Sequence, residues 1–204
     1  MVHAGREGGI RPCWGKQHGG AMTAVKFYQG KKVYLRPVEQ EDHELVYAGK
    51  NDPQVRETLF LSAPMTLEQV RAEMSAWTGS KETVLFTICR QEDQQPVGQT
   101  ALVRIDPVSR VAVFFIAIYN PVFWSQGFAG EATRLIVDYG FNVLNLNRIQ
   151  LHVCCDNDHA VKAYQRAGFQ VEGTLRQAMY HHNRYCDFYV IAVLREEYFR
   201  SSTV

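Results

Sequence analysis

The chain has 204 residues, of which 46% are hydrophobic and 21% charged, a composition typical of a globular protein with room for one sizeable core. Its 22 Lys and Arg residues nearly balance 21 Asp and Glu residues, and the formal net charge of +1 excludes a global basic field that would attract nucleic acid or an anionic membrane. No apolar run approaches the ~18–20 residues that a membrane-spanning helix needs.

The chain opens with a segment rich in glycine and basic residues. Residues 1–22 have neither the apolar stretch of a secretory signal nor a periodic apolar face. We expect them to form a disordered extension, with Met22 as a candidate natural start and a single domain over residues 23–204.

The first half of the domain is predicted to contain one strand, two helices and three further strands. Residues 32–39 alternate as a strand, 41–51 form a short helix, and 51–64 are a loop or a broken helix. Thr66 and Gln69 have the spacing of a capping box and begin a helix that ends at Gly79. Strands follow over 83–90, 96–106 and 110–120. The last is almost wholly apolar and is therefore expected to be buried on both faces.

The second half is predicted to alternate helices and strands. Apolar residues recur at helical spacing from Phe128 to Val143, which predicts a helix of about five turns. A strand over 148–155 and a helix over 157–168 follow, with Gly168 as its C-terminal cap. Strands over 169–180 and 184–194 complete the order β-α-α-β-β-β-α-β-α-β-β, which is typical of a mixed α/β (α+β) fold.

The cysteines indicate a reducing compartment. The five residues form no CxxC pair, and neighbours in a strand point to opposite faces. We interpret them as free thiols of a cytoplasmic protein rather than a disulfide framework. They are Cys13, Cys89, Cys154, Cys155 and Cys186.

Six segments carry a resemblance to a known family. In chain order they read NDPQVRETL, VGQTALVRID, NPVFWSQGFAGEA, LNLNRIQLHV, NDHAVKAYQRAGF and VEGTLR. Over roughly residues 30–198 the chain resembles the GCN5-related N-acetyltransferase (GNAT) superfamily, in particular the branch of ribosomal-protein N-terminal and spermidine acetyltransferases. The resemblance implies a mixed, mostly antiparallel sheet of about six or seven strands, splayed between the fourth and fifth, with about four helices. It also implies acetyl-CoA as cosubstrate and a primary amine as acceptor.

The glycine-rich turn before the long helix is the first candidate site. A helix N-terminus presents unpaired N–H groups and a partial positive charge, and small residues let a pyrophosphate approach. The alternative is a turn with a structural role only. In the family this turn holds the CoA pyrophosphate. The matching positions are Trp124, Ser125, Gln126, Gly127, Phe128, Ala129 and Gly130. Trp124 stands where the family usually has Gln or Arg, which removes a side-chain partner but leaves the backbone donors.

Strand 110–120 matches the family's bulged strand. The resemblance implies that main-chain groups of Phe115, Ile116, Ala117 and Ile118 bind the pantetheine arm and polarise the thioester carbonyl. An ordinary core strand would satisfy the same side chains.

The acid–base residues are assigned by position. Tyr164 matches the tyrosine that often protonates the leaving thiolate, although it shares a helix face with apolar residues and could be a core aromatic. Val113 stands at a position where many family members have a Glu that acts as the general base. His152 occupies the alternative position on the next strand and is the candidate base. The alternatives are a structural role for this histidine and a relay of ordered water that accepts the proton.

Asn157 is expected to cap its helix and contact the cofactor, and Lys162 is a further cofactor-binding candidate. His181 and His182 lack further ligands in sequence, and we expect no metal.

These features predict an acetyl-CoA-dependent N-acetyltransferase that works by direct transfer in a ternary complex. The acceptor is a protein N-terminus or a small-molecule amine. The alternatives are a polyamine, aminosugar or aminoglycoside acetyltransferase and a catalytically degenerate acyl-CoA-binding module. We expect no nucleic-acid or membrane partner, and a homodimer is compatible with the fold.

Overall fold

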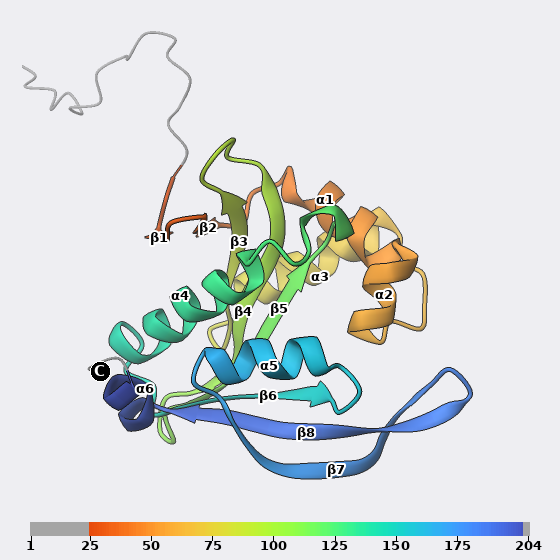
Figure 1. Cartoon of the computed structure of the whole chain (residues 1–204). Helices are drawn as coiled ribbons and strands as arrows, with labels where there is room; N and C mark the ends of the chain where they lie inside the picture. Colours follow the sequence, from red (N-terminus) through yellow and green to blue (C-terminus); the bar gives the residue numbers. More distant parts are fainter. Residues whose placement is uncertain (1–24, 202–204) are drawn as a thin grey trace, which may run out of the picture.

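An eight-stranded sheet forms the centre of the molecule (Figure 1). The computed structural model describes residues 25–201, so the predicted extension over 1–22, the start at Met22 and Cys13 lie outside the described residues. The strands are β1 (Tyr28–Gln29), β2 (Val33–Pro37), β3 (Val84–Arg90), β4 (Pro96–Asp106), β5 (Val111–Ile118), β6 (Arg148–Cys154), β7 (Gln170–His181) and β8 (Arg184–Leu194). Their spatial order is β1-β2-β3-β4-β5-β6-β8-β7, and only the β5–β6 pair is parallel.

Helices cover both faces of this sheet. They are α1 (Asp42–Asn51), α2 (Pro53–Leu59), α3 (Leu67–Gly79), α4 (Phe128–Asn142), α5 (Asp158–Arg166) and α6 (Arg195–Ser201). Ala132 and Ile136 of α4 pack in one core cluster with Phe114 of β5. Val46 of α1 and Val70 of α3 pack in a second cluster with Ala117 of the same strand and Tyr119 just after it. Because adjacent strand residues face opposite ways, α4 and α5 lie on one face and α1–α3 on the other.

The sheet opens between β5 and β6. These strands pair only over Val111–Val113 with Arg148–Gln150. Beyond that point β5 continues along β4, whereas β6 continues along β8 as far as Cys154. The splay predicted between the fourth and fifth strands, 110–120 and 148–155, is therefore confirmed and lies between β5 and β6.

The structure corrects several predicted elements. The sheet has eight strands rather than six or seven, because β1 is a two-residue strand, and six helices rather than four are present in residues 25–201. The segment predicted as a loop or broken helix contains α2, whose N-terminus is capped by Asp52. The α4 helix has 15 residues, about four turns instead of five. The register shift beside β5 puts the extra residue on β4, where Arg104 has a φ of 51°.

Other local predictions are confirmed. Thr66 and Gln69 form a capping box, and Gly168 has the positive φ of 95° that a C-terminal cap uses. Four described cysteines are free thiols: Cys89, Cys154, Cys155 and Cys186. None of the helices in residues 25–201 is long and apolar enough to span a membrane.

Candidate active site

The opening in the sheet leaves main-chain groups of β5 without a strand partner. The N–H of Tyr119 donates to Val97 O of β4, and the carbonyl of Arg110 accepts from Asn147 and Arg148 on the β6 side. Main-chain groups alternate along an antiparallel pair, so the odd-numbered residues of β5 bond to β4 and the even-numbered ones face the opening. Of the four predicted positions, Ile116 and Ile118 therefore direct their N–H groups to the opening, while Phe115 and Ala117 bond to β4.

The turn before α4 leaves a helix N-terminus uncapped. Gly127 is the N-cap residue, with a φ of 84° and no side-chain cap hydrogen bond. In contrast, the N-termini of α2, α3 and α5 are capped by Asp52, Thr66 and Asn157. The first N–H groups of α4 are thus available to an anion, and the helix dipole favours one there.

The turn also has the clearance that a pyrophosphate needs. A Cβ added at Gly130 would meet no heavy atom within 4 Å, and Ser125, Gln126 and Gly127 are exposed. The Phe128 side chain is buried against Phe123, so only its backbone faces the turn. The half-buried Ala129 completes the small-residue surface.

Trp124 has a different role from the polar residue that it replaces. Its indole Nε1 donates to Ile118 O at 3.0 Å, and its ring packs on the cluster of α1–α3. This bond fixes the turn to the end of β5 and occupies the Ile118 carbonyl. Trp124 therefore shapes the route between the turn and the opening, and the positive charge near the turn comes from another residue.

That residue is Lys32, which the sequence analysis did not identify. Its Nζ donates to Gln126 O at 2.9 Å and lies 3.3 Å from the position of a Cβ at Gly127. The carboxylate of Glu131 in the first turn of α4 accepts from the N–H groups of Lys31, Lys32 and Val33. The only sequence signal is a Lys pair before a strand, and 94 residues separate Lys32 from Gln126.

Tyr164 lies on α5 above the open side of β5. Its ring contacts those of Phe114 and Phe169, with centroids 6.0 and 5.8 Å away. Burial raises the pKa of its phenol to about 12, so the group stays protonated at neutral pH. Its side chain is partly exposed, and its hydroxyl makes no hydrogen bond to another of residues 25–201. The arrangement is chemically suited to a proton donor.

The two cofactor-binding candidates near Tyr164 are Asn157, which caps α5, and Lys162, which lies on that helix. Asn157 accepts from the N–H of Ala160 at 3.0 Å, which confirms its capping role. Lys162 is exposed on the outer surface of α5.

His152 approaches from the opposite face of the sheet. Leu151 and Val153 are buried in the core under α4 and α5, so the exposed His152 side chain points to the face of α1–α3. The structure therefore places the candidate acid Tyr164 and the candidate base on different faces of β6. Val113, at the position where many family members have a Glu, also faces α1–α3 and is half-buried.

A cavity of about 240 Å³ lies on that same face. Its walls come from the α1–α3 helices (Val46, Lys50, Leu59, Glu73, Met74, Trp77), from Phe115 of β5, and from Leu61, Leu85, Gln99 and Tyr119. Glu73 forms an ion pair with Lys50 at 2.5 Å. Gln99 is buried, accepts a hydrogen bond from the Tyr119 hydroxyl, and leaves its Nε2 without a partner. Apart from Phe115, which was named for its main-chain groups, the sequence analysis identified none of the lining residues, because they come from segments far apart in the chain.

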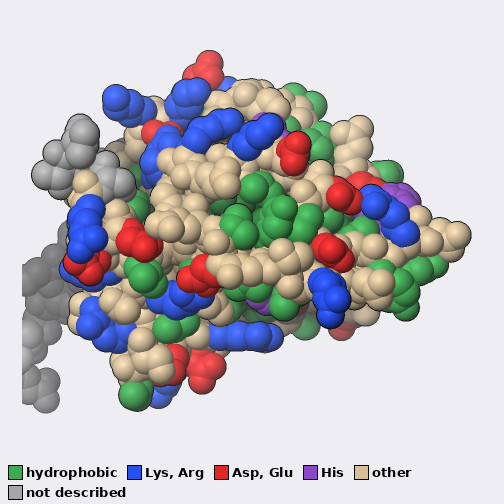
Figure 2. Space-filling model, turned by 60° about the horizontal axis from the view of Figure 1, so that its bottom comes forward, with side chains coloured by type: hydrophobic (Ala, Val, Ile, Leu, Met, Phe, Trp, Pro, Cys, Tyr) green, Lys and Arg blue, Asp and Glu red, His purple; other side chains and the backbone are tan. Residues whose placement is uncertain are grey.

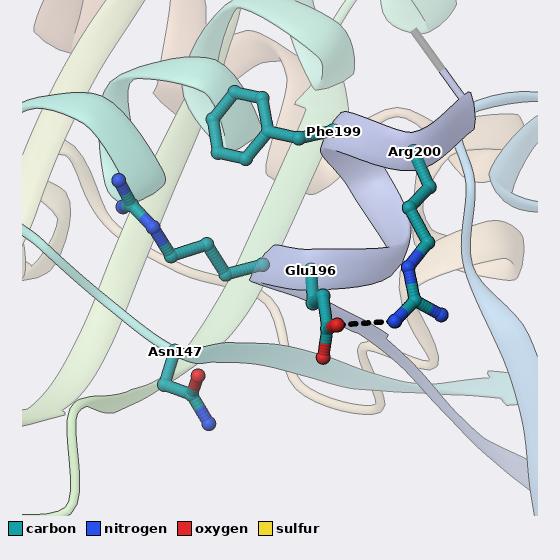
Figure 3. A pocket seen from close by; sticks show the side chains of 5 residues that line it. Asn147, Glu196, Phe199 and Arg200 are labelled. Carbon is teal, nitrogen blue, oxygen red and sulfur yellow. Dashed lines mark hydrogen bonds and ion pairs between the residues drawn. The ribbon is translucent and has the colours of Figure 1, made fainter. Parts of the chain in front are cut away.

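A larger hollow of about 510 Å³ lies far from this region, between α6 and Asn147 (Figure 3). Figure 3 shows Glu196, paired with Arg200, and Phe199 around it. Arg195 also lines the hollow and donates to Phe141 O in the last turn of α4. Since α4 rises 1.5 Å per residue, the hollow is about 20 Å from the turn at Gly127. It is therefore separate from the candidate site.

Comparisons with known proteins agree with this geometry. A family model described as "Acetyltransferase (GNAT) domain" matches residues 32–170. The chain is 35% identical over 173 residues to a spermidine N(1)-acetyltransferase of Vibrio cholerae. The match covers 84% of this chain and 98% of that relative. A crystal structure of spermidine N-acetyltransferase from Vibrio cholerae in complex with CoA and spermine has a TM-score of 0.77 at 26% identity, covering 82% of this chain and 98% of that one. A structure of the Vibrio cholerae spermidine/spermine enzyme in complex with manganese ions has a TM-score of 0.71 at 25% identity, covering 84% and 97%.

Proposed function

This chain belongs to the GNAT family and is an N-acetyltransferase, and we propose that it transfers the acetyl group of acetyl-CoA directly to the primary amine of a small molecule. Three observations carry the proposal: the opening between β5 and β6, the uncapped helix N-terminus at Gly127, and a cavity beside β5 on the face of α1–α3. This arrangement would let donor and acceptor approach β5 from the two faces of the sheet.

The donor half is supported by main-chain donors and one lysine. The N–H groups at the start of α4 and the Nζ of Lys32 would hold the pyrophosphate. The N–H of Ile116 would bind the thioester carbonyl oxygen and stabilise the negative charge that develops on it. Acetyl-CoA supplies the acetyl group and the thiolate leaving group.

We assign the two proton transfers to Tyr164 and His152, which lie on opposite faces of the sheet. Tyr164 would donate its proton to the departing sulfur, because its phenol is neutral at physiological pH and has no competing partner among the described residues. His152 would accept the proton of the incoming ammonium, directly or through water, from the acceptor side. No acyl-enzyme is needed, and burial raises the pKa of the Cys154 thiol, which disfavours a nucleophilic thiolate there.

The acceptor cavity favours an amine that carries an oxygen. The unpaired Nε2 of Gln99 is a buried donor, and a ligand oxygen that accepted from it would remove a cost of about 1–3 kcal/mol. An aminosugar, an amino alcohol or an amino-acid derivative has such an oxygen, whereas a fully protonated polyamine has donors only.

The acidic residues near the cavity are already paired. Glu73 is bound to Lys50, Asp52 accepts from backbone N–H groups of α2, and Glu57 contacts His181 and His182. A polyamine with several ammonium groups would have to displace these partners. Spermidine nevertheless stands as the second candidate, because a curated relative at 35% identity is a spermidine N(1)-acetyltransferase.

The acceptor is identified by measuring CoA release. A free-thiol assay with acetyl-CoA should be run against spermidine, spermine, aminosugars, aminoglycosides, amino-acid derivatives and N-terminal peptides. We expect the highest kcat/KM with an oxygen-bearing small amine and a loss of most of this selectivity in Gln99→Leu. A preference for spermidine would select the second candidate, and a preference for peptides would refute a small-molecule acceptor. CoA binding without turnover of any amine would indicate a binding module.

We also propose a cellular compartment and an oligomeric state. The free thiols of the four described cysteines support a reducing compartment, the cytoplasm. The exposed edge strand β7 supports a homodimer.

A further inference from the structure

We propose that Glu57, His181 and His182 form a binding site for a transition-metal ion, with Zn²⁺ as the best match. The Glu57 carboxylate and one ring nitrogen from each histidine all lie within 4.8 Å of one another. The site is separate from the opening in the sheet, and it joins α2 to the tip of the β7–β8 hairpin (Figure 1).

The hairpin turn brings the two adjacent histidines together. Neighbouring residues in a strand point to opposite faces, so a regular strand could not direct both rings to one ion. Here His182 and Asn183 have φ values of 48° and 62°, as in a two-residue hairpin turn with positive φ at both central positions. The two imidazole rings are consequently 4.2 Å apart, centroid to centroid.

The third ligand comes from a distant part of the sequence. Glu57 is 125 residues from His182, and its Oε1 lies 3.6 Å from His181 Nε2 and in contact with His182 Nε2. Ligand atoms around a tetrahedral zinc ion are about 3.3 Å apart, given metal–ligand distances of about 2.0–2.2 Å. The expectation of no metal rested on the lack of a further ligand in sequence, and folding supplies one.

The donor set selects the class of ion. Two imidazole nitrogens and one carboxylate oxygen suit Zn²⁺, Co²⁺ or Ni²⁺ better than Mg²⁺ or Ca²⁺, which prefer oxygen donors. Three protein ligands leave a fourth tetrahedral position for water, and the His182 and Glu57 side chains are 67% and 48% exposed, so an ion can enter.

The described residues around the site orient His181 and leave the Glu57 carboxylate without a pairing arginine. The Phe60 ring packs against the His181 imidazole at 4.5 Å and against Phe188 at 5.0 Å, which orients one ligand from behind. Arg184, next to the turn, is bound to Asp156 at 2.6 Å rather than to Glu57. The same ion pair makes the nearby Cys154–Asp156–Cys186 group a weaker metal site, since its carboxylate already has a partner.

An ion at this site would fix α2 against the hairpin. The C-terminal residue of α2, Leu59, lines the acceptor cavity together with Leu61. Metal occupancy would therefore hold one wall of that cavity. Metal binding itself does not rest on the proposed acceptor.

The test uses the full-length chain without a histidine tag, stripped with a chelator and titrated with Zn²⁺ by calorimetry and with Co²⁺ by visible absorption. We expect one ion per chain. His182→Asn, which suits a positive φ, and the isosteric Glu57→Gln should each weaken Zn²⁺ binding by about 100-fold or more, with thermal stability of the metal-free protein little changed.

Two controls make the result specific. His159→Ala removes an exposed histidine on α5, and a His3→Ala/His18→Ala variant removes those of the N-terminal segment; neither should alter the affinity. The proposal is overturned if the parent binds no Zn²⁺, if His182→Asn and Glu57→Gln bind it as tightly as the parent, or if the Co²⁺ complex shows a thiolate charge-transfer band that Cys154→Ser abolishes.

Discussion

Burial and charge decide what individual residues of the site can do. Tyr164 packs against Phe114 and Phe169, and burial raises the pKa of its phenol, while Lys32 is exposed and carries its charge to the turn at Gly127. These two side chains would act on opposite ends of the same cosubstrate, one at the sulfur and one at the pyrophosphate. Their substitutions should consequently affect different kinetic parameters.

For Tyr164→Phe we expect kcat to fall by roughly 10²-fold or more with unchanged CoA affinity, because the variant loses only the proton donor and keeps the ring. Tyr139→Phe, which removes a hydroxyl from a core ring of α4, is the matched control and should leave kcat intact. Equal kcat values for Tyr164→Phe and the parent would assign the proton transfer to solvent.

The raised pKa of Tyr164 also predicts a pH dependence. A phenol with a pKa of about 12 keeps its proton as the pH rises through the usual tyrosine value of 10. Loss of the proton donor should therefore not lower kcat of the parent between pH 8 and about 10. A fall in kcat over this range that disappears in Tyr164→Phe would contradict the assigned pKa shift.

Lys32→Ala should weaken CoA binding by about 10-fold or more, since a hydrogen bond to a charged group contributes about 1.5–3 kcal/mol. Lys31→Ala is the matched control, because only its main-chain N–H is held by Glu131. Calorimetry in low and moderate salt measures both. If the two variants bind CoA equally well, the lysine at the turn has no role in holding the pyrophosphate.

At the scale of elements, α1 is joined to the sheet by one buried carboxylate. Asp42 accepts from the Arg36 guanidinium at 2.8 and 2.7 Å, from the Thr87 hydroxyl at 2.6 Å and from the N–H of Glu39 at 2.9 Å. These partners lie on β2, on β3 and in the connection to α1, so one side chain sets the position of the helix that carries Lys50 into the cavity proposed for the acceptor.

Asp42→Ala should lower the free energy of unfolding by about 3–5 kcal/mol, because it leaves the Arg36 charge buried without a partner. Glu44→Ala, in the same helical turn but exposed, should change it by less than about 0.5 kcal/mol. Urea denaturation of the two variants measures the difference. A loss below about 1 kcal/mol for Asp42→Ala would show that water reaches Arg36 and replaces the carboxylate.

At the scale of the whole molecule, the β7–β8 hairpin is the most exposed part of the sheet. Figure 2 shows hydrophobic side chains gathered near the middle of one face, with acidic and basic side chains around them. Val171, Leu175 and Met179 of the edge strand β7 are 43%, 41% and 39% exposed. An exposed edge with apolar side chains is a surface on which a second copy of the chain can pair.

Light scattering should accordingly give a mass of twice the 23.3 kDa of one chain. Leu175→Arg should shift this mass toward the monomer, whereas Val108→Arg, at a turn residue that is 90% exposed, should not. A parent protein that is monomeric at micromolar concentration would refute the homodimer.

Much of this protein follows from local sequence patterns. Apolar periodicity placed α4 and β5, the Thr66 capping box and Gly168 marked helix ends, and the small residues around Gly127 marked the turn before α4. These features are predictable because their hydrogen bonds and faces involve residues a few positions apart. The two-residue β1 and the seven-residue helices α2 and α6 carry too little periodicity to be found in this way.

Only the tertiary structure decided which distant residues share a site. Lys32 reaches the turn of α4, Gln99 and Glu73 meet in one cavity, and Glu57 joins two histidines 124 and 125 residues away. The fold also determined that Ile116 rather than Phe115 faces the opening, because that choice depends on the register of β5 with β4. The sequence by itself determined the family, the main elements and the turn at Gly127, since each is encoded within a continuous segment. Contacts across the sheet depend on the packing of the whole chain, and no local pattern records them.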